Sequence, residues 1–124
     1  MGYSIGAVSK RTGISIDTLR FYERVGLTPN IERTPGGQRV YNDQDLAFLE
    51  FAQKMRATGM PLEALSRYVA LMKRGIETVP ERRAMLQQYA ADVEARLAEL
   101  EKAQDALRMT ISWYQAIEAR ENAT

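Results

Sequence analysis

Apolar positions in the first 26 residues recur three and four apart, in two short segments that glycine ends. This spacing predicts a short helix over residues 3–12, which Gly13 terminates. Ser15 can cap the N-terminus of a second helix over about 16–25, because its hydroxyl accepts from exposed N–H groups. Two short helices joined by a tight turn with glycine are typical of a helix-turn-helix.

The pattern changes between residues 30 and 41, where helix-breaking residues replace the helical spacing. Pro35, Gly36 and Gly37 mark a turn, with apolar residues before it and after it. This arrangement predicts a small β-hairpin with Arg33 and Arg39 on either side of its tip.

Helical spacing then returns in two segments. Asn42, followed three residues later by Asp45, resembles a capping box at the start of a helix over about 43–58. Pro61 suits the first turn of a further helix, over about 61–74, which Gly75 closes.

The last segment predicts one long helix from about Pro80 to Glu118 or beyond, with a heptad repeat. One apolar seam on a lone helix stays exposed to water, so we expect the same helix of a second chain to cover it. The predicted homodimer interface consists of Leu86, Ala90, Val93, Leu97, Leu100, Gln104, Leu107, Ile111 and Tyr114.

Composition narrows the chemistry. The chain has neither Cys nor His, which excludes thiolate or imidazole metal sites, disulfides, Cys nucleophiles and His bases. Residues 1–75 hold 11 Lys and Arg against 7 Asp and Glu, and residues 76–124 hold 6 against 9. The first part therefore suits a polyanion. With neither a signal peptide nor a long apolar run in the sequence, we expect a cytoplasmic protein.

Three segments together closely resemble the DNA-binding domain of the MerR family: 5–13 (IGAVSKRTG), 18–27 (TLRFYERVGL) and 33–41 (RTPGGQRVY). The resemblance covers roughly residues 3–75, and the long helix is similar to the family's dimerisation helix. It implies a mainly α fold, with a winged helix-turn-helix DNA-binding domain over residues 1–75. An antiparallel coiled-coil dimerisation helix over 76–124 would follow, with a short C-terminal tail.

The resemblance also implies a function. Family members bind double-stranded promoter DNA as homodimers, and they bend and untwist a promoter whose spacer is too long for RNA polymerase. Direct and backbone contacts to DNA are implied for Ser15, Asp17, Thr18, Arg20, Tyr22, Arg33, Arg39, Tyr41 and Arg56.

An effector is less well defined by the sequence. Family members often bind metals through Cys, and a branch that responds to electrophiles carries a reactive Cys, but this chain has none. We therefore expect no cofactor and no direct sensing of metals or thiol oxidation through Cys or His. An apolar pocket for a small-molecule effector could be lined by Tyr68, Tyr89, Trp113 and Tyr114, although aromatic packing of the long helix against the helix over 61–74 is the simpler interpretation.

Two other classes stay open at this stage. An architectural DNA-binding protein of the excisionase type shares the winged helix, but it lacks a long dimerisation helix. A coiled-coil interaction protein without DNA function would not need the basic hairpin. An enzyme is not indicated, because the sequence shows neither a nucleophile–base pair nor a glycine-rich phosphate loop.

Overall fold

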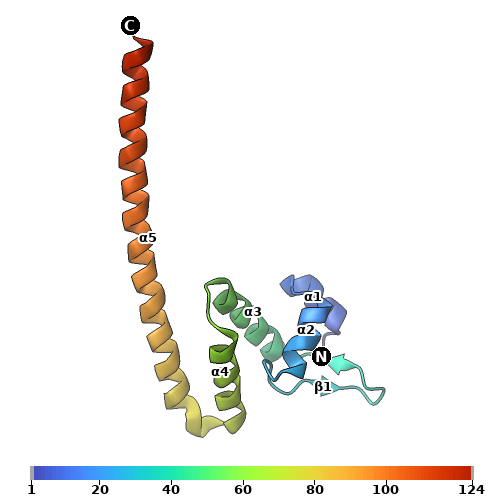
Figure 1. Ribbon diagram of the computed structural model, residues 1–124. Coiled ribbons are helices and arrows are strands. Elements are labelled where there is room, and N and C mark those ends of the chain that lie inside the picture. The colour runs from blue at the N-terminus through green and yellow to red at the C-terminus, as the bar shows by residue number, and fades with distance from the viewer. Residues whose placement is uncertain (1, 124) are drawn as a thin grey trace. The chain divides into compact units, whose positions relative to one another are not determined.

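The computed structural model describes residues 2–123 and is mainly helical. The chain divides into two compact units, one up to Met85 and the other from Leu86 onward. Figure 1 shows the elements of each unit, which are described separately below. No helix among the described residues is long and apolar enough to cross a membrane.

The first unit begins with the helix-turn-helix. Helix α1 (Ile5–Thr12) starts at Ser4, whose hydroxyl accepts from the N–H of Ala7, and ends at Gly13 with φ of 78°. The predicted start at residue 3 is two residues early, because the backbone of Tyr3 instead pairs with that of Tyr41 in a β-bridge. Helix α2 (Ile16–Arg24) is capped by Ser15 as predicted.

The wing is an antiparallel hairpin of two short strands, β1 (Glu32–Arg33) and β2 (Arg39–Val40). Its register places Arg33 opposite Arg39, and Gly37 closes the turn with φ of 86°. A positive φ is accessible to glycine without the steric cost that a Cβ brings, so the glycine in this turn has a conformational role.

Helices α3 (Asp43–Ala57) and α4 (Leu62–Arg74) complete the support of this unit. The capping box forms as predicted, since Asn42 and Asp45 each accept from the other's backbone N–H. Burial raises the pKa of the Asp45 carboxyl, and its hydrogen bond from Asn42 acts in the opposite direction. One core cluster holds the helix-turn-helix, the wing base and α3 together: Val8, Ile14, Leu19, Tyr41, Leu46 and Leu49.

A short 3-10 helix, η1 (Ile76–Thr78), follows Gly75 and leads into α5 (Val79–Asn122), which is 44 residues long. The Thr78 hydroxyl donates to the carbonyl of Leu71 and accepts from Arg82, which stabilises this corner of the first unit. In the second unit α5 is the single described element, and its side chains are almost all exposed.

Candidate nucleic-acid interface

The start of α2 presents a polar, exposed face. The Ser15 hydroxyl caps the helix by accepting from the Thr18 N–H, and it donates to the Thr18 hydroxyl. Asp17 is almost fully exposed and lies 4.0 Å from Arg20, a loose ion pair between solvated groups. Such pairs contribute little energy, so Arg20 can exchange Asp17 for another anion at small cost.

The end of α2 is tied to the wing by one carboxylate. Glu23 Oε1 accepts from Arg39 Nε at 2.6 Å and from an Arg33 guanidinium nitrogen at 3.0 Å. Both arginines face each other across the hairpin, where like charges repel. Glu23 offsets that repulsion and leaves the three groups with a net charge of +1.

The wing tip is held as well. Arg33 donates a second hydrogen bond, at 3.0 Å, to the carbonyl of Gly37 in the turn. The side chains of Arg39 and Glu23 are about one-fifth exposed, whereas that of Arg33 is nearly half exposed. Arg33 is therefore the more accessible wing cation, and Arg39 has the more structural position of the two.

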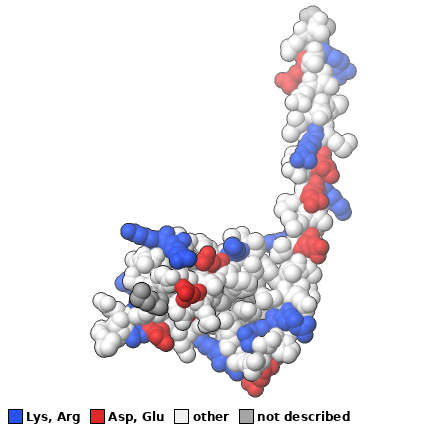
Figure 2. Space-filling model, turned by 180° about the vertical axis from the view of Figure 1, so that it is seen from behind, with Lys and Arg blue, Asp and Glu red and all other residues white. Residues whose placement is uncertain are grey.

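Three elements meet around a hollow of about 370 Å³ on this face. It is lined by the start of α1, by α2 and by the wing, through Ser4, Ile5, Arg20, Gly37, Gln38 and Arg39. Cationic side chains from α2 and the wing thus border the same concave surface. This surface suits a polyanion backbone, which arginine binds through charge-assisted hydrogen bonds. Figure 2 shows Lys and Arg side chains on the surface of the molecule.

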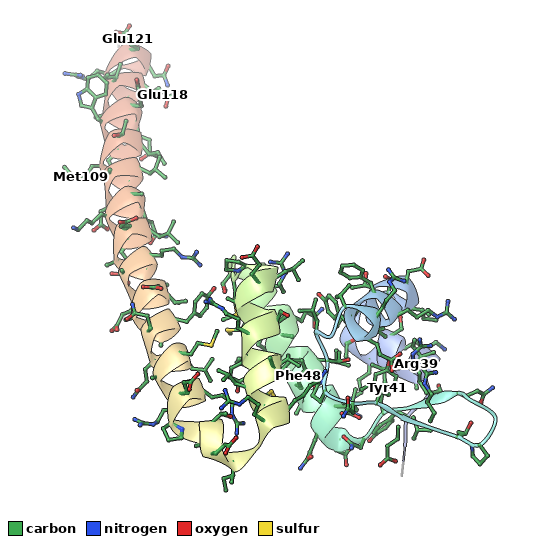
Figure 3. All side chains as sticks on the ribbon, turned by 60° about the horizontal axis from the view of Figure 1, so that its bottom comes forward. Arg39, Tyr41, Phe48, Met109, Glu118 and Glu121 are labelled. Carbon is green, nitrogen blue, oxygen red and sulfur yellow. The ribbon has the colours of Figure 1, made fainter. Side chains whose placement is uncertain are left out.

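Tyr41, for which a contact with DNA was predicted, is a core residue in this structure. Tyr41 is 1% exposed, belongs to the core cluster, and its hydroxyl is buried without a hydrogen-bond partner. Burial, and secondarily the charge of Glu23, raise the pKa of its phenol. Figure 3 shows Tyr41 near Arg39 at the base of the wing. Tyr41 therefore anchors the base of the wing in the core.

Tyr22 and Arg56 occupy intermediate positions. Tyr22 is half-buried and packs against the core cluster, so only part of its ring and hydroxyl can reach a ligand. Arg56 is half-buried and donates to the carbonyl of Met60 at 2.5 Å, which ties the end of α3 to the turn that follows. Arg56 therefore has a structural role beside the backbone contact predicted for it.

The predicted dimer residues lie along α5 in the second unit, where Leu86 and Val93 are partly buried and the five large residues from Leu97 onward are exposed. Leu97, Leu100, Leu107, Ile111 and Tyr114 keep between 53% and 66% of their surface. An apolar series of this length left in water is unusual for a folded chain, and it indicates a partner surface.

The four aromatic residues predicted for an effector pocket are placed in different surroundings. Tyr68 on α4 packs against Phe51 at 5.7 Å between ring centroids. Trp113 and Tyr114 are neighbours on α5 in an edge-on contact at 5.0 Å, and both are more than half exposed. The contact of Tyr68 is with α3, so it tests neither the pocket nor the packing of the coiled coil against the fourth helix, and both stay predictions.

Sequence reasoning missed the role of Glu23. A partial signal was present, since an anion near two arginines on paired strands is favourable. The register of the hairpin was needed to see that the same carboxylate serves both, across 10 and 16 residues of sequence.

Comparison with known proteins agrees with this geometry. Residues 3–72 match the family model "MerR HTH family regulatory protein", and residues 46–110 match "MerR, DNA binding". An uncharacterized HTH-type transcriptional regulator of Haemophilus influenzae is 34% identical, over 96% of this chain and 88% of its own length. The HTH-type transcriptional regulator AdhR of Bacillus subtilis is 41% identical, over 77% of this chain and 66% of its own length.

Solved structures show the same fold. HiNmlR, described as a MerR family regulator lacking the sensor domain and bound to promoter DNA, superposes with a TM-score of 0.86 at 34% identity. The match covers 96% of this chain and 94% of that one. A MerR family regulator from Listeria monocytogenes gives a TM-score of 0.89 at 34% identity, over 97% of this chain and 92% of that one. The winged helix-turn-helix and these similarities together identify the chain as a member of the MerR family of DNA-binding transcriptional regulators.

Proposed function

We propose that this regulator binds promoter DNA as a homodimer and activates transcription by deforming the promoter. In this proposal residues 1–75 bind DNA and residues 76–124 dimerise. The exposed apolar series on α5 supports the dimer, because covering it requires a partner of matching pattern. Two recognition helices would then enter successive major grooves about 34 Å apart.

The concave surface shared by α2 and the wing is the main support for DNA binding. Arg20 and Arg39 both line this surface. Arg33 binds the same carboxylate as Arg39, that of Glu23, and so lies close to the surface. A recognition helix reads base edges, while wing cations bind phosphates, which fixes the register of the protein on the duplex. Ser15, Asp17 and Thr18 lie at the start of the same helix and would set the base preference.

Deformation follows from holding two such surfaces on one duplex. Smoothly bending a site of 20–30 base pairs costs about 1–6 kcal/mol, which the additional contacts that the bend permits can offset. Such a distortion would realign promoter elements that lie too far apart for RNA polymerase.

The direct test uses purified protein and the DNA beside its coding region. We expect binding to one site with an inverted repeat, and a bend in circular-permutation gel shifts. Activation in vitro should disappear when two base pairs are removed from the spacer, since the promoter then needs no realignment. Tight binding without a bend would contradict the deformation mechanism while leaving DNA binding intact.

We also propose that the direct signal is not a thiophilic metal or a thiol oxidant. The sequence holds no Cys or His, and no group of three or more metal-ligating side chains occurs among residues 2–123. Soft ions need thiolate or thioether ligands. Cu(I), Hg(II), Zn(II), diamide or an aldehyde, added separately, should leave operator binding and transcription in vitro unchanged. A stoichiometric, reversible response to a soft metal would refute this and point to methionine ligands.

A further inference from the structure

Helix α2 presents one side chain directly away from the core of its unit. With 3.6 residues per turn, Asp17 lies about 140° around the helix axis from Tyr22 and about 160° from Leu19. Leu19 is 1% exposed, and Tyr22 packs against the core cluster. The Asp17 side chain is accordingly 97% exposed. Asp17 therefore occupies the outermost point of the helix, in its first turn.

The side chains on either side of Asp17 face other surfaces. Arg20 lies about 60° around the helix, on the wing side, where it lines the concave surface. Phe21 lies about 40° away on the other side, where it lines a hollow shared with α4. Thr18 is engaged with Ser15 through its hydroxyl and its N–H. Asp17 is thus the group that points straight outward from the start of α2.

We propose that Asp17 is a specificity-determining residue, whose carboxylate accepts a hydrogen bond from the N4 amino group of one cytosine in each half-site. This inference rests on the proposed binding of promoter DNA and names a base that the site selects. In a helix-turn-helix, the N-terminal residues of the second helix contact base edges in the major groove. The outermost side chain of that turn reaches the floor of the groove, while Arg20 on the wing side faces the phosphates along its wall.

A carboxylate restricts the contacts that are possible in the groove. An ionised carboxylate only accepts hydrogen bonds, and phosphates repel it, so Asp17 is unsuited to the DNA backbone. The major groove presents two kinds of donor, the N4 amino group of cytosine and the N6 amino group of adenine. Guanine and thymine present acceptors, which repel a carboxylate. Asp17 therefore selects against guanine and thymine at the position that it faces.

The neighbours of the two amino groups favour cytosine over adenine. The adenine amino group lies between two acceptors, N7 of the same base and O4 of the paired thymine. Both flanks therefore repel the second oxygen of the carboxylate. The cytosine amino group has an acceptor on one flank, O6 of the paired guanine, and a C5–H group on the other. The second oxygen can lie on the C5–H side without this repulsion.

Asp17 also has a local role in the helix, which the test must separate from base selection. A negative side chain in the first turn of a helix interacts favourably with the helix dipole. This role contributes to stability and does not depend on the DNA sequence. The charge of Asp17 also lowers the affinity for every DNA sequence alike, because it repels phosphates. The base profile of the half-site is therefore the measurement that distinguishes the proposed contact.

Selection from a randomised duplex library with the full-length protein gives this profile. The wild-type protein should select cytosine at one position of each half-site. Asp17→Ala should lose that preference, by about tenfold, and keep the preferences at other positions. Asp17→Asn should change the preferred base at the same position to adenine, because an amide donates to N7 and accepts from N6. Asp17→Asn has nearly the same shape as the wild type, so a folding defect of Asp17→Ala leaves the test intact.

A modified base tests the contact at the level of atoms. The base 2-pyrimidinone lacks the N4 amino group of cytosine. When it replaces the selected cytosine, wild-type binding should weaken about tenfold, and Asp17→Ala binding less than about threefold. The weaker pairing of 2-pyrimidinone with guanine affects both proteins and therefore cancels in the comparison.

Glu50→Gln is the matched control for charge. Glu50 is exposed on α3, and its substitution removes the same negative charge as Asp17→Asn. This variant should keep the wild-type base profile at every position, including the cytosine, because a change in net charge acts on all sequences alike.

The outcomes separate base selection from DNA binding itself. Tighter binding of all sequences by Asp17→Ala, with an unchanged base profile, would overturn the inference and leave Asp17 with its local role alone. An equal effect of 2-pyrimidinone on both proteins, or a wild-type preference for adenine, would also overturn it. If the wild-type protein selected no sequence from the library, the proposed function would fail instead.

Discussion

A single carboxylate decides how the wing is held. Glu23 accepts from two arginines that otherwise repel each other across the hairpin, and it fixes the wing against the recognition helix. It also cancels one positive charge on a surface proposed to bind phosphates. Glu23 therefore has two opposing effects on DNA binding: it orients the wing, and it lowers the positive charge of the surface.

Glu23→Gln should lower the free energy of unfolding by about 1–2 kcal/mol, because hydrogen bonds to charged groups contribute about 1.5–3 kcal/mol and the amide oxygen of Gln still accepts. Random-sequence DNA should bind more tightly, with a salt dependence steeper by up to about one ion, because the face gains a positive charge. Fluorescence anisotropy at several salt concentrations measures this. Weaker binding of random DNA would show that the pose of the wing matters more than its charge.

Arg39 is predicted to bind phosphate rather than base edges. Arg39→Ala should weaken binding to operator and random DNA alike, and reduce the salt slope by about one ion. Arg39→Lys, which keeps the charge, should retain most of the slope. If random-sequence affinity stayed the same while one base preference vanished, Arg39 would be a base reader.

At the scale of elements, caps determine where the helices of the first unit begin. The capping box at α3 is reciprocal, with hydrogen bonds of 2.7 and 2.9 Å between Asn42 and Asp45. The start of α3 matters for the interface, because α3 follows the wing directly. The Tyr3 hydroxyl donates to the Asp43 carboxylate in the first turn of α3, and the Tyr3 backbone pairs with Tyr41.

Asp45→Ala should destabilise the protein by about 1 kcal/mol, the usual effect of losing a cap. Asp45→Asn should cost less, because its amide oxygen still accepts from the Asn42 N–H and the burial of a charge is relieved. Urea unfolding of both variants, with the exposed Gln44→Ala as control, gives the comparison. Equal losses for Asn and Ala would mean that the carboxylate charge itself is needed.

At the scale of the whole molecule, the proposed function makes DNA affinity depend on dimerisation, because one recognition helix would reach only one half-site. Leu100→Glu should yield monomers that bind the operator at least about a hundredfold more weakly, since a carboxylate buried in each seam is costly. Glu99→Gln, next to it on the same helix and outside the seam, is the control. Sedimentation that showed an intact Leu100→Glu dimer would sink the coiled-coil assignment.

Much of this molecule was determined by the sequence alone, because its information is local. Ser15, Gly13 and the Asn42–Asp45 pair act within a single turn, so they place helix ends without knowledge of the rest of the fold. The heptad spacing of apolar residues is enough to predict the long helix α5 and its apolar seam. The family motifs are continuous segments, so they too can be recognised in the sequence. The fold class and the regulator class were therefore both predictable.

The tertiary structure decided what depends on contacts between distant segments. The sequence around Tyr41 does not distinguish a buried residue from an exposed wing residue. Residues of α1, α2 and α3 pack around Tyr41 and make it part of the core. Tyr3 leaves the predicted helix because its backbone finds a partner 38 residues away. Glu23 acquires its role only when hairpin pairing brings two arginines to one carboxylate, since electrostatic attraction depends on distance in space and not on position along the chain.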